Sequence, residues 1–273
     1  MKINEILNKT IVQFLILGLF LAPCCAQKLP NVQETGMRVP GTVKIDGKID
    51  EWGGKLQAFN DRVTLFYTIA NDEDNIYLVV HCTNSLIIKK IINGGLSFSI
   101  NVLHKKEKGS VSVLYPFVSR ADYDKALKSL PEGVSNGPNN DKQAAFKKRS
   151  DSLLTNWQAK KLEDLRLIKV SGIEEIEDPL ISIYNQYDIK IGRRLESKYS
   201  YSYELAVPIK YLGNPADIQF VYYNIKLPGP PMYEYHNPVV VQGGGSYLTE
   251  GGVDLRSLDS VTDFWGQYKL MKK

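Results

Sequence analysis

The fold of this chain is decided by the stretch Val43-Lys44-Ile45-Asp46-Gly47-Lys48-Ile49-Asp50-Glu51-Trp52-Gly53-Gly54. Its first residues alternate between apolar and polar, as expected of a half-buried strand. Asp46 and Gly47 then predict a tight turn, because Asp can hydrogen-bond to the backbone after it and Gly accepts positive φ. Trp52 follows closely, and we interpret it as a buried ring that closes one end of a β-sandwich. Asp46, Gly47 and Trp52 are therefore assigned structural roles.

Strand signals continue along most of the chain. Residues 62–70 and 75–83 are β-rich, and the polar residues 71–74 between them predict a hairpin. The second of these strands is apolar at nearly every position, which predicts a central strand buried on both faces. Further strands are predicted at 96–102, 110–115, from 167 onward, 181–191, 199–207, 217–225 and 264–270.

Two regions have helical composition instead. A short helix is predicted at 85–92, capped by Ser85 and ended by the glycines that follow Asn93. A longer helical insertion is predicted at about 117–165, where Trp157 shares one helical face with other apolar residues and is expected to pack on the sheet. The whole pattern predicts an all-β fold, an antiparallel β-sandwich with one helical insertion, in a single domain over 27–273.

The first 26 residues are set apart from this domain. Two lysines precede an apolar run at 11–21 that is too short to span a bilayer as a helix. This order is typical of a secretory signal peptide, so we predict that residues 1–26 are removed. The alternative is lipoprotein processing at Cys24, because residues 21–24 partly match a lipobox. Both routes predict a protein that is secreted or held in the periplasm or cell envelope, and only lipidation at Cys24 would attach it to a membrane.

Length, charge and cysteine content limit what the mature chain can be. Removing 26 of the 273 residues leaves 247, enough for one large β domain. The net charge of the full chain is +4, too mild to indicate a nucleic-acid partner. Cys82 is the one cysteine that follows the leader, so an intramolecular disulfide is excluded and the hydrophobic core has to stabilise the fold.

Three short segments carry a family resemblance. They are the opening IDGKIDEW at 45–52, the strand end YELAVP at 203–208 and the closing DFWG at 263–266. Together they bracket most of the mature chain, and they resemble the family 9 carbohydrate-binding modules. The resemblance implies a jelly-roll β-sandwich that binds a saccharide or glycan without catalysis.

Candidate sugar-binding residues gather near the C-terminus. Residues 228–260 form a long irregular region rich in Gly, Pro and Tyr, and a long loop on a rigid sandwich is where function tends to reside. Sugar sites combine apolar ring faces with a few placed polar groups. Our candidates are therefore Tyr233, Tyr235, Tyr247 and Trp265. The alternative is that these rings pack the loop onto the sheet.

Cofactor signals are weak. The acidic stretch 71–75 is compatible with calcium, which takes oxygen ligands from loops, but it is equally typical of a polar hairpin turn, which we favour. Haem is a further alternative, with Met37 or Met232 and His81 or His236 as axial ligands. The three histidines are far apart in sequence, which does not indicate zinc. We predict no cofactor, with calcium as the alternative.

The sequence therefore predicts a secreted, non-catalytic protein that reversibly binds a saccharide. One alternative is an interaction or structural protein of the cell envelope with the same fold and no sugar site. The other is an enzyme of unknown class, since acidic residues are plentiful although no pair is singled out. The chain has no Gly-x-Ser-x-Gly nucleophile elbow, and its Gly243-Gly244-Gly245 run does not join a strand to a helix as a phosphate loop does.

Overall fold

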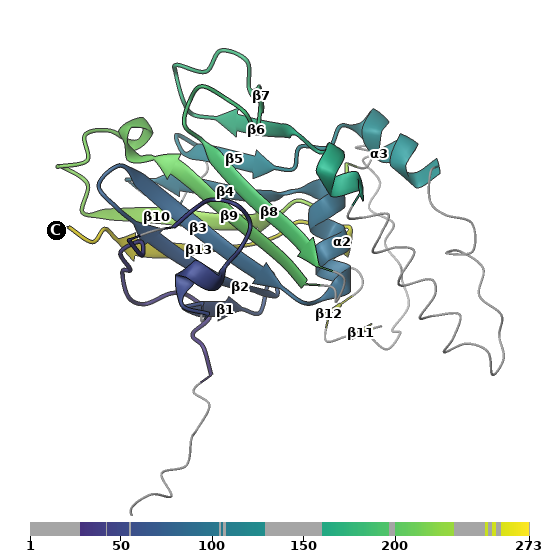
Figure 1. The fold of residues 1–273 in the computed structure, drawn as a ribbon, viewed down its shortest axis with the longest axis horizontal. Helices are drawn as coiled ribbons and strands as arrows, with labels where there is room; N and C mark the ends of the chain where they lie inside the picture. The colour runs from purple at the N-terminus through teal and green to yellow at the C-terminus, as the bar shows by residue number, and fades with distance from the viewer. Residues whose placement is uncertain are drawn as a thin grey trace, which may run out of the picture.

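Two antiparallel sheets face each other in the computed structural model, which confirms the predicted β-sandwich (Figure 1). The structure describes residues 28–41, 43–54, 56–103, 105, 108–128, 160–196, 200–231, 249–250, 253–254 and 258–272. The predicted leader lies outside these residues. Among the described helices, none is long and apolar enough to cross a membrane.

The two sheets differ in size. The first has five strands, in the order β1 (Ala58–Asn60), β2 (Leu65–Asn71), β3 (Asn75–Cys82), β9 (Ser200–Pro208) and β8 (Lys190–Glu196). The second has six, in the order β13 (Thr262–Lys269), β10 (Phe220–Leu227), β4 (Leu96–Asn101), β5 (Val111–Tyr115), β6 (Leu167–Ser171) and β7 (Leu180–Ser182). A two-stranded ribbon, β11 (Thr249–Glu250) with β12 (Val253–Asp254), stands apart.

The main core lies between the sheets and contains several tyrosines. Alternate residues of each strand point inward, as the period of two predicts. The Tyr67 and Tyr223 hydroxyls meet at 2.9 Å in the middle of this core, and burial raises the pKa of both. The fully buried tyrosines come from strands of both sheets: Tyr67, Tyr115, Tyr201, Tyr203, Tyr223 and Tyr268.

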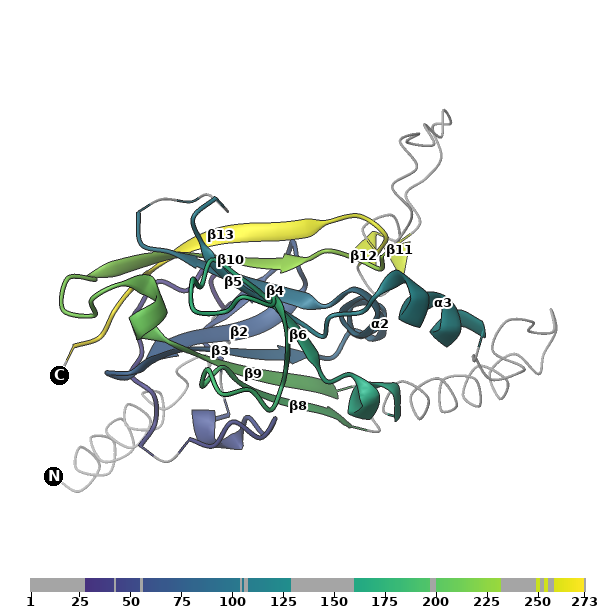
Figure 2. The same cartoon turned by 90° about the horizontal axis from the view of Figure 1, so that it is seen from above.

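Helix α2 (Ser85–Gly94) closes one end of the space between the sheets (Figure 2). Its isoleucines join the main core. The helix confirms the prediction in its place and its C-terminal glycines, but the predicted cap was wrong. Asn84 is the N-cap, because its side-chain oxygen accepts hydrogen bonds from the backbone N–H groups of Leu86 and Ile87. Ser85 is already the first residue of the helix.

The five-stranded sheet is buried on both faces over part of β2, β3 and β9. Residues 37–56 lie over its outer face, where a second, smaller core contains Trp52 and Leu56 of this segment and Tyr77 and Val79 of β3. Figure 2 shows the segment and its short helix η1 (Asp50–Trp52) on the opposite side of this sheet from β10 and β13. The two cores explain why β3 is apolar at nearly every position and confirm its prediction as a central strand.

Trp52 is structural, but its predicted place was wrong. Its ring is 2% exposed and belongs to the second core, so it covers the outer face of a sheet and does not close an end of the sandwich. The strand predicted before the turn was wrong, because residues 43–45 form no strand. Val43 and Ile45 are half-buried as the alternation predicted, but it could not say which face of which sheet they cover.

A single carboxylate, Glu204 on β9, holds this covering segment in place. Glu204 is 0% exposed. Its Oε2 accepts hydrogen bonds from the backbone N–H groups of Asp46 and Gly47 at 3.0 and 2.7 Å, and its Oε1 accepts one from Trp52 Nε1 at 2.7 Å. Burial raises the pKa of Glu204, whereas the three donors lower it. The IDGKIDEW and YELAVP motifs are thus two halves of one contact.

The turn also needs glycine on both sides of the contact. Gly47 has a φ of +88°, and a Cβ there would come within 2.5 Å of the backbone of Arg193. Gly192 on β8 lies directly opposite Glu204, and a Cβ there would run into the backbone nitrogens of Asp46 and Gly47. The turn therefore rests directly on the backbone of β8, and a side chain at either glycine would prevent this contact. Asp46 keeps its predicted turn role by accepting the Lys48 N–H at 2.9 Å.

Two further sequence predictions concern the helical insertion and the strand at 181–191. Helix α3 (Arg120–Lys128) and a helical stretch at 160–164 stand at the two ends of the predicted insertion. Trp157 lies outside the described residues. The single strand predicted at 181–191 was wrong, because a turn separates β7 in one sheet from β8 in the other. Asn185 stabilises that turn by donating to Ile189 O and accepting from Tyr187 N.

Candidate functional site

The outer face of the six-stranded sheet is polar, unlike the covered outer face of its partner. The strand register places its side chains in rows that cross the sheet. One row runs Asp263, Lys226, Ser97, Leu114, Lys169. The next runs Trp265, Asn224, Ser99, Ser112, Ser171. Hydroxyl, amide and charged groups from five strands therefore share one surface.

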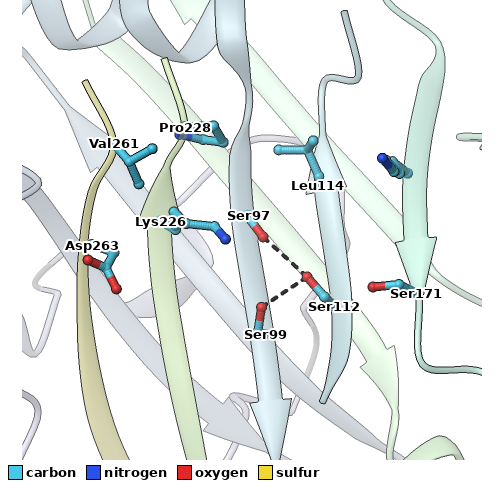
Figure 3. Close-up of a pocket in the computed structure, with 10 residues that line it drawn as sticks. Ser97, Ser99, Ser112, Leu114, Ser171, Lys226, Pro228, Val261 and Asp263 are labelled. Atoms are coloured by element: carbon cyan, nitrogen blue, oxygen red, sulfur yellow. Dashed lines mark hydrogen bonds between the residues drawn. The ribbon is translucent and has the colours of Figure 1, made fainter. Parts of the chain in front are cut away.

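A hollow of about 460 Å³ lies on this surface (Figure 3). Its polar lining contains four serines, two lysines and one aspartate, and its apolar lining contains one leucine, one proline and one valine. The lining residues are Ser97, Ser99, Ser112, Leu114, Lys169, Ser171, Lys226, Pro228, Val261 and Asp263. The size suits a small ligand or one or two sugar rings.

Short hydrogen bonds hold the floor of the hollow in one arrangement. The Ser112 hydroxyl contacts the hydroxyls of Ser97 and Ser99 at 3.2 and 2.9 Å, which Figure 3 marks as dashed lines. At the side of the hollow, the Asn224 amide donates to Asp263 Oδ2 at 2.8 Å and to the Phe264 carbonyl at 2.9 Å. Asn224 is 0% exposed, so it fixes the Asp263 carboxylate from below. The polar groups are oriented before any ligand arrives.

Trp265 lies on the same face, beside the hollow. It is half-buried on the edge strand β13, one position along the outer face from Asp263 and directly across from Asn224. Tyr222 continues the face on β10, where it lines a second depression of about 530 Å³ with Gln267, Phe220 and other residues. Trp265 thus stands between two depressions, and the side chain of Phe264 before it points into the core. Of the predicted sugar-binding residues, it is the one that the structure describes.

The three predicted tyrosines, Tyr233, Tyr235 and Tyr247, lie outside the described residues. The described residues at both ends of their region do bear on the prediction. Pro228 follows β10 and Val261 precedes β13, and both line the hollow. The region predicted as irregular at 228–260 therefore begins and ends at this site, although the paired strands β11 and β12 lie within it.

Several exposed apolar side chains surround the same face. Leu167 on β6 and Leu180 on β7 are 42% and 37% exposed, and both share the outward direction of Lys169. On the other side, Leu103 is 78% exposed and lines the second depression. Leu167 and Leu180 are close together across β6 and β7, whereas Leu103 stands apart from them.

Sequence reasoning missed the serines, the two lysines and Asp263 as site residues. The signal was present, since Ser97 and Ser99 alternate with Leu96 and Phe98 of the main core and so had to face the other side of the sheet, where they are themselves only 4% and 2% exposed. What the alternation could not give is the register, which alone brings Ser112, Ser171 and Asp263 beside them.

The acidic turn at 71–75 uses its oxygens locally. Asp72 Oδ1 accepts the backbone N–H groups of Asp74 and Asn75, and Asp72 Oδ2 accepts the Tyr77 hydroxyl at 2.6 Å. Glu73 pairs with Arg38 at 2.7 Å. Within the described residues, no group of three or more His, Cys, Asp or Glu is arranged to hold a metal ion.

The structure separates two of the residues considered for haem. Met37 hydrogen-bonds to the backbone of Asn71, whereas His81 pairs with Phe66. These positions are five residues apart along β2, about 17 Å at the usual rise of a strand. Met232 and His236 lie outside the described residues.

Comparison with profiles of known protein families finds no match, and comparison with curated protein sequences finds no similar chain.

Proposed function

We propose that this protein is a secreted, non-catalytic module that reversibly binds a saccharide on the outer face of the six-stranded sheet. The observation that carries the proposal is the contrast between the two outer faces. Residues 37–56 cover one, and the other carries a hollow lined by oriented serines, with Trp265 beside it. The resemblance of three motifs to family 9 carbohydrate-binding modules supports the same function.

The chemistry of the hollow suits a sugar. Serine hydroxyls donate and accept hydrogen bonds, as sugar hydroxyls do, and the Asp263 carboxylate accepts from them. A tryptophan ring offers an apolar face to the C–H side of a pyranose, and Trp265 stands at the side of the polar floor. Asp263 is the single acid among the described residues that line the hollow, whereas glycosidases use two carboxyl groups. Binding without reaction is therefore the better account.

The proposal also includes the three tyrosines and the secretion that the sequence predicts. Tyr233, Tyr235 and Tyr247 belong to a region whose two ends meet the hollow, so we propose that they contribute further ring contacts to the sugar. Secretion rests on the leader at 1–26, with a lipid anchor at Cys24 as its alternative. Neither calcium nor another cofactor has a role in the proposed binding.

A glycan array followed by isothermal titration calorimetry tests the proposal. We expect at least one oligosaccharide to bind, and Trp265→Ala to weaken that binding about tenfold, because stacking on one ring is worth about 1.4 kcal/mol. Phe59→Ala is the matched control. Phe59 is also a half-buried aromatic on an edge strand, but on the outer side of the other sheet, packed 4.6 Å from Phe66. Absence of binding by any saccharide at millimolar concentration would refute the proposal.

A protein partner in the cell envelope is the second candidate. The exposed Leu103, Leu167 and Leu180 around the same face favour it, since sugars make little use of aliphatic side chains. Replacing Leu167 and Leu180 with serine distinguishes the two functions. Saccharide affinity should stay unchanged if the hollow is the site, whereas a docking surface would lose its partner.

A further inference from the structure

We propose that the hollow is selective for an anionic sugar, one that carries a carboxylate or a sulfate group. This inference rests on the proposed function and specifies its ligand. It comes from the two lysines that the strand register brings to opposite sides of the serine floor.

The geometry of the row is the first argument. Lys226, Ser97, Leu114 and Lys169 lie side by side on four adjacent strands. Neighbouring strands are about 4.8 Å apart, so the two lysine Cα atoms are about 14 Å apart across the sheet. Both lysines line the same hollow, and Figure 3 labels Lys226 beside Ser97. A sugar ring lying on the floor between them would place its substituents within reach of an ammonium group on either side.

The balance of charge is the second argument. Among the described residues lining the hollow, the cations are Lys169 and Lys226 and the anion is Asp263. Asp263 is opposite Lys226 on the neighbouring strand, and one of its oxygens already accepts the Asn224 amide. The Lys169 side of the hollow therefore has no acid of its own in the lining and favours a negative group.

The hydroxyl floor is the third argument. Charge-assisted hydrogen bonds from hydroxyl or ammonium donors to an anionic oxygen are about twice as strong as neutral ones. Ser171 lies two residues after Lys169 on β6, with Ser112 opposite it on β5, and each serine can turn an O–H toward a carboxylate or sulfate oxygen. Lys169 Nζ is 5.9 Å from the centre of the Phe117 ring, a weak contact at an exposed site that a stronger anionic partner would displace.

The test measures binding of three oligosaccharides of matched length to the mature protein by calorimetry. One is an uncharged galactan, one an oligogalacturonide and one a sulfated galactan, so that the last two separate a carboxylate from a sulfate. We expect an anionic oligosaccharide to bind at least tenfold more tightly than the neutral one at low salt. Raising the salt from 50 to 500 mM should reduce that advantage, because the lysines are in contact with solvent.

Lysine variants locate the effect. Lys226→Met and Lys169→Met should each weaken binding of the anionic oligosaccharide about fivefold and leave binding of a neutral one unchanged. Lys44→Met is the matched control, because Lys44 is exposed on the segment that covers the other sheet. If Lys226→Met does not fold, the exposed Lys169 and the salt series still decide the question.

Two outcomes are distinct. If the neutral oligosaccharide binds as tightly as the charged ones, or if the lysine variants behave like Lys44→Met, the anionic selectivity is wrong and saccharide binding stands. If none of the three binds at millimolar concentration and the glycan array is also blank, both proposals fail.

Discussion

Replacing Glu204 with glutamine tests whether one buried carboxylate fastens the covering segment to the sheet. The change keeps the size of the side chain, so it adds no cavity. The carboxylate faces three N–H donors, two from the turn and one from Trp52. A glutamine has one acceptor oxygen, and its amide nitrogen must face either the backbone donors or the indole N–H.

The magnitude follows from the better of these two orientations. In this orientation the glutamine oxygen still accepts the N–H groups of Asp46 and Gly47, and its NH₂ group faces Trp52 Nε1–H. One hydrogen bond to a charged group is therefore lost, and two N–H donors face each other in a buried site. A hydrogen bond to a charged group contributes about 1.5–3 kcal/mol, and an unsatisfied buried donor costs about as much again. We expect the free energy of unfolding to fall by about 3 kcal/mol at neutral pH.

Urea denaturation of the mature chain, followed by circular dichroism, measures the effect. Glu196→Gln is the matched control, because Glu196 ends the neighbouring strand β8 and makes an exposed ion pair with Arg194 at 3.3 Å. It should change stability by less than about 0.5 kcal/mol. The same loss in both variants would refute the role of Glu204.

The pH dependence adds a second check on Glu204. Its pKa in the folded protein lies above the ordinary 4.5, so below pH 4.5 the wild-type carboxyl is protonated in the folded and the unfolded states. Because the folded state binds this proton more tightly than the unfolded state, wild-type stability should rise as pH falls through the folded pKa, and its advantage over Glu204→Gln should widen. A difference that stays constant or shrinks down to pH 4 would contradict the raised pKa of Glu204.

Two other predictions follow from the packing. Gly47→Ala and Gly192→Ala should each lower the free energy of unfolding by about 3 kcal/mol or more. Gly41→Ala is the control and should be nearly neutral, because a Cβ at Gly41 meets nothing within 4 Å. Equal effects of the three variants in urea denaturation would refute the close approach of turn and strand. Lys90 of α2 is buried and donates to Ser260 O and Thr262 Oγ1, and burial lowers its pKa to about 8. Its unfolded form holds the proton up to about pH 10.5, so stability should rise with pH from 8 to 9.5, and this rise should be smaller in Lys90→Met; parallel pH curves would contradict it.

The sequence allowed the strands to be predicted wherever alternation was strong. The alternating strand β4 and the inward tyrosines of β9 followed from a period of two, and the hairpin of β2 and β3 followed from two β-rich segments joined by polar turn residues. Helix α2 followed from its glycine end, and only its cap was displaced by one residue, because Asn84 and Ser85 are both good capping residues.

Contacts between distant residues could not be predicted in this way. Trp52 and Glu204 are 152 residues apart, and both had been noticed as parts of motifs, but nothing in either motif names the other as its partner. The covering role of residues 37–56 depends on that contact, so Trp52 was assigned to the wrong surface. The hollow depends in the same way on the register of five strands, which brings Lys169 and Asp263, 94 residues apart in the sequence, to one surface.

Backbone NMR of the mature protein during titration with a saccharide selected from the array tests the central claim most directly. The account predicts that shifts concentrate on the outer face of β4, β5, β10 and β13, with Ser99, Lys226 and Trp265 among the most affected. The amides of Asp46, Gly47 and the indole of Trp52, held by Glu204 on the other sheet, should stay unmoved. Shifts centred on that covering segment would contradict the account.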